Sequence, residues 1–176
     1  YAPNNVTRFP MKDGAPDFSQ RTEPDTETVD ETRAVYIAFQ TLSADENLSA
    51  QEEYDCRRTI FENLRHLDWQ EYGRLGEAGK EIETQQALLD WLRTRRDFSR
   101  DELLELQLGC ESNLDGWLSE DYSNILCHAF FLSPIEFAAL LADSDNSAEN
   151  ALNVVSQTAY GADLDPKGRE AAAAAL

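Results

Sequence analysis

Cysteine and histidine are the residue types in this chain that could ligate a transition metal, and their spacing argues against such a site. Cys127 and His128 are adjacent, whereas Cys56, Cys110 and His66 lie far from them in the sequence. Consecutive residues of a helix point about 100° apart, so the adjacent pair cannot easily share an ion. No C-x-x-C or H-x-x-x-H spacing occurs. We therefore interpret the cysteines as buried and inert, and we expect no metal and no cofactor.

The run from Asp143 to Ser147 begins like a calcium-binding loop, with oxygen-bearing side chains at its first, third and fifth positions. Such a loop also needs glycine at its sixth position and a bidentate glutamate at its twelfth. Those positions hold Ala148 and Val154 instead. The run is therefore predicted to be a turn that caps the helix after it.

Nucleophilic catalysis needs a serine or cysteine with a base beside it. The two histidines, His66 and His128, lie in no nucleophile elbow, and no Walker-type or G-x-G-x-x-G phosphate loop occurs. Close pairs of carboxylates arise by chance among 34 acidic residues. We therefore expect a non-catalytic protein with no catalytic residue. An uncharacterised enzyme or ligand-binding bundle, with a pocket under a connector at Gly73, Gly76 and Gly79, is a third hypothesis.

The strongest signal in the sequence is a block of negative charge. The formal net charge is −19, and between Arg100 and Lys167 there are thirteen acidic residues and no lysine or arginine. Such a block repels itself, nucleic acid and anionic membranes, so we expect no direct binding to nucleic acid or to a membrane. It favours a basic protein surface as the partner. The residues predicted to bind that partner are Asp101, Glu102, Glu105, Glu111, Asp115, Glu120, Asp121, Glu136, Asp143 and Asp145.

Two functions follow from this acidic surface, and solubility or adaptation to high salt is the alternative to both. The first is a protein-interaction module, in one form a nucleic-acid mimic that inhibits a DNA- or RNA-handling protein, by analogy with anti-restriction and anti-CRISPR proteins. Thirteen charges correspond to roughly 22 Å of duplex, and a module of ~80 residues is roughly 30 Å across, so mimicry is physically possible. The second is a helical adaptor or assembly subunit that uses its N-terminal arm and meets a basic subunit.

A small basic cluster, Arg93, Arg95, Arg96 and Arg100, directly precedes the acidic block. It could form an anion-binding or nucleic-acid-binding patch. Cations near a helix C-terminus also stabilise the helix by roughly 0.3–1 kcal/mol each, and these arginines are the nearest countercharge to the acids. We favour the structural interpretation.

The spacing of the apolar residues predicts an all-α fold, because period-two alternation is nearly absent. We expect a compact bundle of seven or eight short-to-medium helices with an extended N-terminal arm. Residues 28–176 are interpreted as a single helical domain with an acidic sub-region at 101–165. Residues 1–27 carry four of the six prolines and no periodic apolar pattern, which predicts an extended or disordered arm.

Three capping boxes mark helix starts, because a serine and a glutamate three residues later satisfy each other's free backbone N–H groups. They begin at Ser49, Ser99 and Ser133, the last with Pro134 at the first helical position. The helix after Ser49 is predicted to turn Tyr54, with Ile60 and other apolar residues, toward the core.

The expected helices cover residues 28–43, 49–69, 82–96, 99–109, 122–132, 135–142, 148–160 and a short segment after Pro166. The three glycines at 73, 76 and 79 predict a loop near 70–81. Gly161 is predicted to close the helix before it. The segment 122–132 is the most apolar and is predicted to be a buried central helix.

Composition indicates the cellular environment in which the chain folds. Hydrophobic residues make up 41% of 176 residues, and the three cysteines cannot all pair internally, which favours a reducing cytoplasm. No run approaches eighteen apolar residues, so no membrane-spanning helix is expected. The chain begins at Tyr1 rather than methionine, which leaves room for a removed leader. The sequence predicts no oligomeric state.

Overall fold

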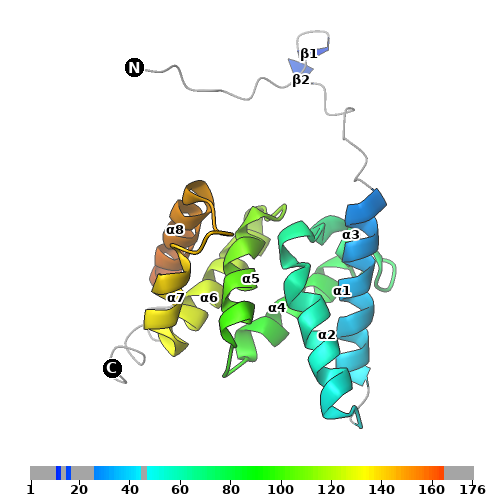
Figure 1. Cartoon of the computed structure of the whole chain (residues 1–176). Coiled ribbons are helices and arrows are strands. Elements are labelled where there is room, and N and C mark those ends of the chain that lie inside the picture. Colours follow the sequence, from blue (N-terminus) through cyan, green and yellow to red (C-terminus); the bar gives the residue numbers. More distant parts are fainter. Residues whose placement is uncertain (1–10, 13–14, 17–25, 45–46, 165–176) are drawn as a thin grey trace.

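The computed structural model describes the backbone of residues 11–12, 15–16, 26–44 and 47–164, and the side chains of residues 30–44 and 47–163 (Figure 1). Within these residues the chain forms eight α-helices, so the predicted all-α bundle of seven or eight helices is confirmed. The predicted arm over 1–27 and the helix after Pro166 lie almost wholly outside the described residues. Of the arm, β1 (Met11–Lys12) and β2 (Ala15–Pro16) pair as a short antiparallel ladder.

The helices stack from one end of the molecule to the other. Figure 1 shows α1 and α2 at one end and α7 and α8 at the opposite end, with α5 and α6 between them. Two short 3-10 turns join neighbouring helices. The elements in chain order are α1 (Thr26–Ala44), α2 (Ala50–Glu62), η1 (Leu64–His66), α3 (Trp69–Arg74), α4 (Glu81–Thr94), α5 (Arg100–Leu108), η2 (Gly109–Glu111), α6 (Gly116–Leu132), α7 (Pro134–Leu140) and α8 (Ala148–Leu164).

Two of the three predicted capping boxes form. The Ser49 side chain accepts from the backbone N–H of Glu52, whose carboxylate accepts from the backbone N–H of Ser49 in return. Ser99 and Glu102 make the same reciprocal pair at the start of α5. Each pair satisfies two N–H groups that the first turn of a helix leaves free.

The third predicted capping box, at Ser133, is wrong. Ser133 is at once the residue after α6 and the residue before α7, with φ −146° and ψ 65°, and its side chain makes no capping hydrogen bond. The two helices meet there at a bend of 117°. Pro134 does occupy the first turn of α7, as predicted.

The second helix is shorter than predicted. It ends at Glu62 rather than near residue 69, and the 3-10 turn η1 follows. Asp68 then caps a new helix by accepting from the backbone N–H groups of Gln70 and Glu71. That helix, α3, occupies the first half of the predicted loop over 70–81 and contains Gly73. A Cβ on Gly73 would lie 3.0 Å from the carbonyl oxygen of Glu81, so this glycine allows close packing rather than a loop.

Gly161 does not close α8, contrary to the prediction, because the helix continues through it to Leu164. A Cβ at this position would lie 2.1 Å from the carbonyl oxygen of Ser123 on α6. Glycine is therefore required where the backbones of α6 and α8 approach one another.

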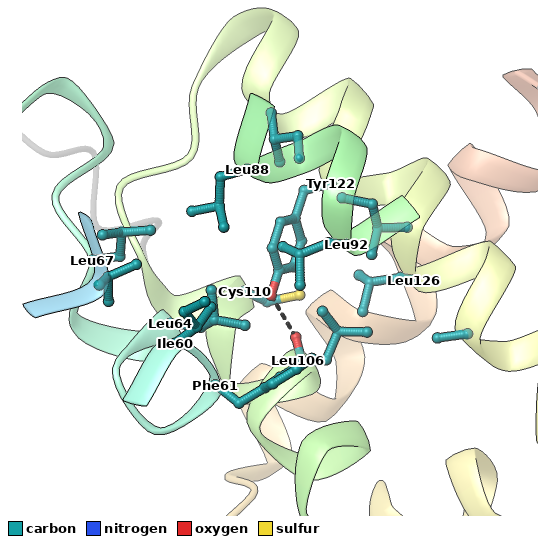
Figure 2. Close-up of a cluster of buried hydrophobic side chains, with 14 of the residues drawn as sticks. Ile60, Phe61, Leu64, Leu67, Leu88, Leu92, Leu106, Cys110, Tyr122 and Leu126 are labelled. Carbon is teal, nitrogen blue, oxygen red and sulfur yellow. Dashed lines mark hydrogen bonds between the residues drawn. The ribbon is translucent and has the colours of Figure 1, made fainter. Parts of the chain in front are cut away.

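The core lies where η1, α4, α5 and α6 converge. Figure 2 shows Tyr122 among leucines of these elements, with its hydroxyl donating to the carbonyl oxygen of Leu106 at 2.8 Å. The predicted central helix is confirmed as part of α6, which begins earlier, at Gly116. Burying each large apolar side chain contributes roughly 1.5–3 kcal/mol. Ile60 is buried as predicted, whereas Tyr54 is exposed, which corrects its inward assignment.

Candidate functional site: an acidic cleft between α2 and α5

A cleft of about 580 Å³ lies between α2 and α5 and is rich in charged side chains. Five acidic residues and two arginines line it, together with aromatic and aliphatic side chains. The charged lining residues are Arg57, Arg58, Glu62, Asp101, Glu102, Glu105 and Asp145.

The local sequence of α5 places its acids toward this cleft. Leu103 and Leu106 are buried in the core, so the opposite side of the helix faces outward. Asp101 and Glu105 are four residues apart and therefore share one side of the helix. Asp145 reaches the same cleft from the turn between α7 and α8.

Both arginines of the cleft already have carboxylate partners. Arg57 binds Glu102 in a bidentate arrangement, with Nη2 at 2.8 Å and 3.0 Å from the two carboxylate oxygens. The side chains of this pair are 23% and 12% exposed, so the pair is more shielded from water than an ordinary surface ion pair. Arg58 binds Glu62 one turn further along α2 at 2.6 Å.

Three carboxylates of the cleft have no cationic partner among the described residues: Asp101, Glu105 and Asp145. Within the described part of the chain the side chain of Asp145 makes no hydrogen bond, and its backbone N–H donates to Asp143. Burial raises the pKa of Glu105 to about 7, and repulsion from Glu62, Asp145 and Asp101 adds to the rise, while Arg65 opposes it. The cleft therefore holds a carboxyl group that changes charge near neutral pH and that an additional cation would stabilise in its ionised form.

Three more of the predicted partner-binding residues are neutralised inside the molecule. Arg65 binds Glu111. Arg100 binds Glu136 at 3.2 Å and Asp143 at 2.9 Å. The pKa of Asp143 is lowered, first by the backbone N–H of Asp145 and then by Arg100.

The last three predicted residues lie around the start of α6, away from the cleft lining. Asp115 is the residue before the helix and its side chain makes no capping hydrogen bond. Glu120 accepts from the hydroxyl of Tyr160 at 3.5 Å, and Asp121 accepts from the side-chain amide of Gln86 at 3.0 Å. The cleft thus brings together four of the ten predicted residues, and their role in binding a partner stays a prediction.

The sequence does not predict that residues of α2 form one wall of the cleft. Tyr54, Arg58 and Glu62 are spaced by four and so share one side of that helix, which is a readable signal. Nothing in this spacing tells which other helix that side will face.

The four-arginine cluster is largely occupied by local contacts. Arg93 pairs with Asp90, and the guanidinium of Arg95 lies over the ring of Trp91, 5.1 Å from its centroid. Burial lowers the pKa of Arg95. With Arg100 bound to two acids, these contacts agree with the structural interpretation of the cluster.

The described residues include no group of three or more histidine, cysteine or acidic side chains placed to hold a metal ion. No disulfide joins any two of the three cysteines. A hollow of about 550 Å³ does lie beside Gly79, and its lining side chains include three acids but no serine, cysteine or histidine. In the described part of the chain no single helix is long and apolar enough to cross a membrane, and α6 with α7 meets that criterion only as a bent pair.

Comparisons with models of protein families, with curated proteins and with solved structures find no match for this chain.

Proposed function

We propose that this chain is a non-catalytic protein-interaction module whose acidic cleft receives lysine or arginine side chains from a basic surface of a partner protein. The observation that carries the proposal is the imbalance within the cleft. Asp101, Glu105 and Asp145 lack a cation, whereas both arginines of the cleft are already bound to other acids.

A basic side chain entering the cleft gains more there than on an open surface. Glu105 is half-buried, so an ion pair formed with it is less screened by water and salt than an exposed pair. Burial raises the pKa of Glu105 most, and the neighbouring acids add to the rise, so a cation of the partner would stabilise the ionised form of this side chain. Arg57 and Arg58 hold neighbouring acids in place and leave the remaining ones to the partner.

The partner class includes nucleic-acid-binding proteins, because they present basic surfaces. A cleft that accepts a few basic side chains requires a local match of charge. Mimicry of a duplex requires a long row of unpaired acids, and Glu102, Glu111, Glu136 and Asp143 are paired within the chain. The geometry therefore favours recognition of a short basic segment, which would displace nucleic acid by competing for that segment.

The test is calorimetric titration with an oligolysine peptide of about eight residues at low ionic strength, where charge contacts are least screened. The cleft variant combines Asp101→Asn, Glu105→Gln and Asp145→Asn. The control variant combines Glu83→Gln, Asp115→Asn and Glu149→Gln, three exposed acids outside the cleft lining. Both variants remove the same number of charges from the formal −19.

We expect the cleft variant to weaken binding by about tenfold, since charged hydrogen bonds contribute about 1.5–3 kcal/mol. The control variant should weaken it by less than about threefold, as exposed pairs contribute about 0–1 kcal/mol. Equal weakening in both variants would mean that the peptide responds only to the overall field of the protein, and the cleft would then have no special role.

A further inference from the structure

The helix α8 leaves several apolar side chains exposed at its surface. Its buried residues include Asn150, Val154 and Gly161. Leu152 and Val155, by contrast, are 73% and 51% exposed. A surface helix ordinarily turns its apolar residues to the core, so these exposed side chains are free to contact another surface.

Polar contacts and a close backbone approach set this orientation. The side-chain amide of Asn150 donates to the carbonyl oxygen of Gln107 at 3.1 Å. Gln157 exchanges hydrogen bonds with Ser119 on α6. Gly161 lies against the backbone of α6 at Ser123. Leu152 and Val155, which are mostly exposed, therefore contribute little to holding α8 to the bundle.

The exposed side of α8 borders an apolar groove of about 250 Å³ that α6 and α7 complete. Along α8, Leu152, Val155, Ala159 and Ala162 follow one another at intervals of three, four and three residues. That spacing is typical of the seam along which one helix packs against another. The last three of these residues line the groove together with Phe130, Phe131 and Leu141.

Charge identifies the kind of helix that fits this groove. The described helices α6, α7 and α8 contain no lysine or arginine. Their acidic residues are Glu120, Asp121, Glu136, Glu149 and Asp163. Glu136 is paired with Arg100, but the three helices still carry a net negative charge. A second copy of the chain would bring helices of the same charge, whereas a helix with basic flanks would be attracted.

We propose that this groove binds an amphipathic helix of a partner protein, with apolar residues at intervals of three and four that enter the groove and with lysine or arginine on its flanks. The surface is separate from the acidic cleft, and the proposal does not depend on the function assigned to that cleft.

The experiment measures fluorescence anisotropy of a labelled peptide of roughly 18 residues, with leucines at helical spacing and lysines at the other positions. A scrambled peptide of the same composition keeps the charge but loses the apolar stripe. The groove variant is Leu152→Gln with Val155→Gln. The control variant is Ile37→Gln with Ile82→Gln, because these residues are 57% and 61% exposed and lie on α1 and α4.

We expect the amphipathic peptide to bind the wild-type chain at least about tenfold more tightly than the scrambled peptide, and the groove variant to lose that advantage. The control variant and the triple cleft variant should each keep the preference for the amphipathic over the scrambled peptide. Loss of that preference in the cleft variant alone would place the peptide in the cleft and overturn the groove proposal.

Three other results overturn the proposal. One is equal binding of the two peptides by the wild-type chain. Another is a wild-type dimer in sedimentation that the groove variant abolishes, which would assign the groove to a second copy. The third is binding of the wild-type chain, but not of the groove variant, to vesicles of neutral phosphatidylcholine, which would assign the apolar surface to lipid.

Discussion

The hydroxyl of Tyr122 lies 2.0 Å from the position that a Cβ on Gly109 would occupy, and the same hydroxyl donates to the carbonyl oxygen of Leu106 at 2.8 Å. Gly109 has φ −58° and ψ −16°, a conformation that any residue adopts. Glycine is therefore present at position 109 because the tyrosine hydroxyl fills the space, and backbone conformation has no part in it.

We expect Gly109→Ala and Tyr122→Phe each to lower the free energy of unfolding by about 1–3 kcal/mol, the first by overpacking and the second by leaving the Leu106 carbonyl without its donor. The double variant should lose less than the sum, because removing the hydroxyl makes room for the methyl group. Urea denaturation of the four proteins measures this coupling. Strict additivity of the two losses would contradict the contact.

Ser99→Ala and Ser133→Ala form a matched pair of substitutions. Ser99 accepts from the backbone N–H of Glu102, whereas Ser133 makes no capping hydrogen bond. The first change should cost about 1 kcal/mol and the second close to nothing. Thermal melting of both variants measures the difference, and a larger loss at Ser133 would show that its hydroxyl does cap α7.

Glu105→Gln should change how stability depends on pH. The pKa of Glu105 is raised from 4.5 to about 7 in the folded protein. The folded state therefore binds this proton more tightly than the unfolded chain does. The stability that this provides is fully present below about pH 4.5 and is lost as the pH rises through about 7.

Glutamine stays neutral at every pH, so Glu105→Gln should raise the melting temperature more at pH 8 than at pH 4.5. Because the whole chain is acidic, the comparison is made between variant and wild type at each pH, with Asp115→Asn as the control. A rise in melting temperature that is the same at both pH values, or the same in the control, would exclude the proposed role of Glu105.

Gly161→Ala tests the approach of α6 and α8. Alanine ordinarily favours a helix over glycine by about 1 kcal/mol. Here its methyl group would meet the carbonyl oxygen of Ser123 at 2.1 Å, which is backbone and cannot swing aside. The change should therefore destabilise the protein, by about 1–3 kcal/mol.

The control for this change is Ser156→Ala, at an exposed position within the same helix. It should leave the denaturation midpoint unchanged or raise it slightly. A stabilising effect of Gly161→Ala would mean that the backbone of α8 at Gly161 does not lie against Ser123 of α6.

Sequence patterns predict the structure where the contacts involved are between residues close together in the sequence. The capping boxes at Ser49 and Ser99 involve residues three apart, so their sequence pattern predicts the contact. The same pattern forms no capping box at Ser133, because that residue directly follows α6 and lies at the sharp bend between the two helices. The sequence predicts that Gly73 and Gly161 interrupt or end helices. In the structure each glycine instead allows close packing against a residue of another helix.

The acidic cleft was predictable in its charge and not in its shape. The sequence shows an acidic block after Arg100, and Asp101 and Glu105 belong to it. Which acids are neutralised depends on contacts such as Arg57 with Glu102, which are 45 residues apart. No periodicity predicts that α2 will lie against α5.

In the part of the chain that the structure describes, the ion pairs between residues far apart in the sequence all place the arginine first. Arg57, Arg65 and Arg100 precede their partners Glu102, Glu111, Glu136 and Asp143. During synthesis each arginine is therefore added to the chain before the acidic residue with which it forms an ion pair. Each later acid emerges into a nascent chain that already offers it a cation, so local attraction helps α5 and α7 to dock although the finished protein repels itself overall.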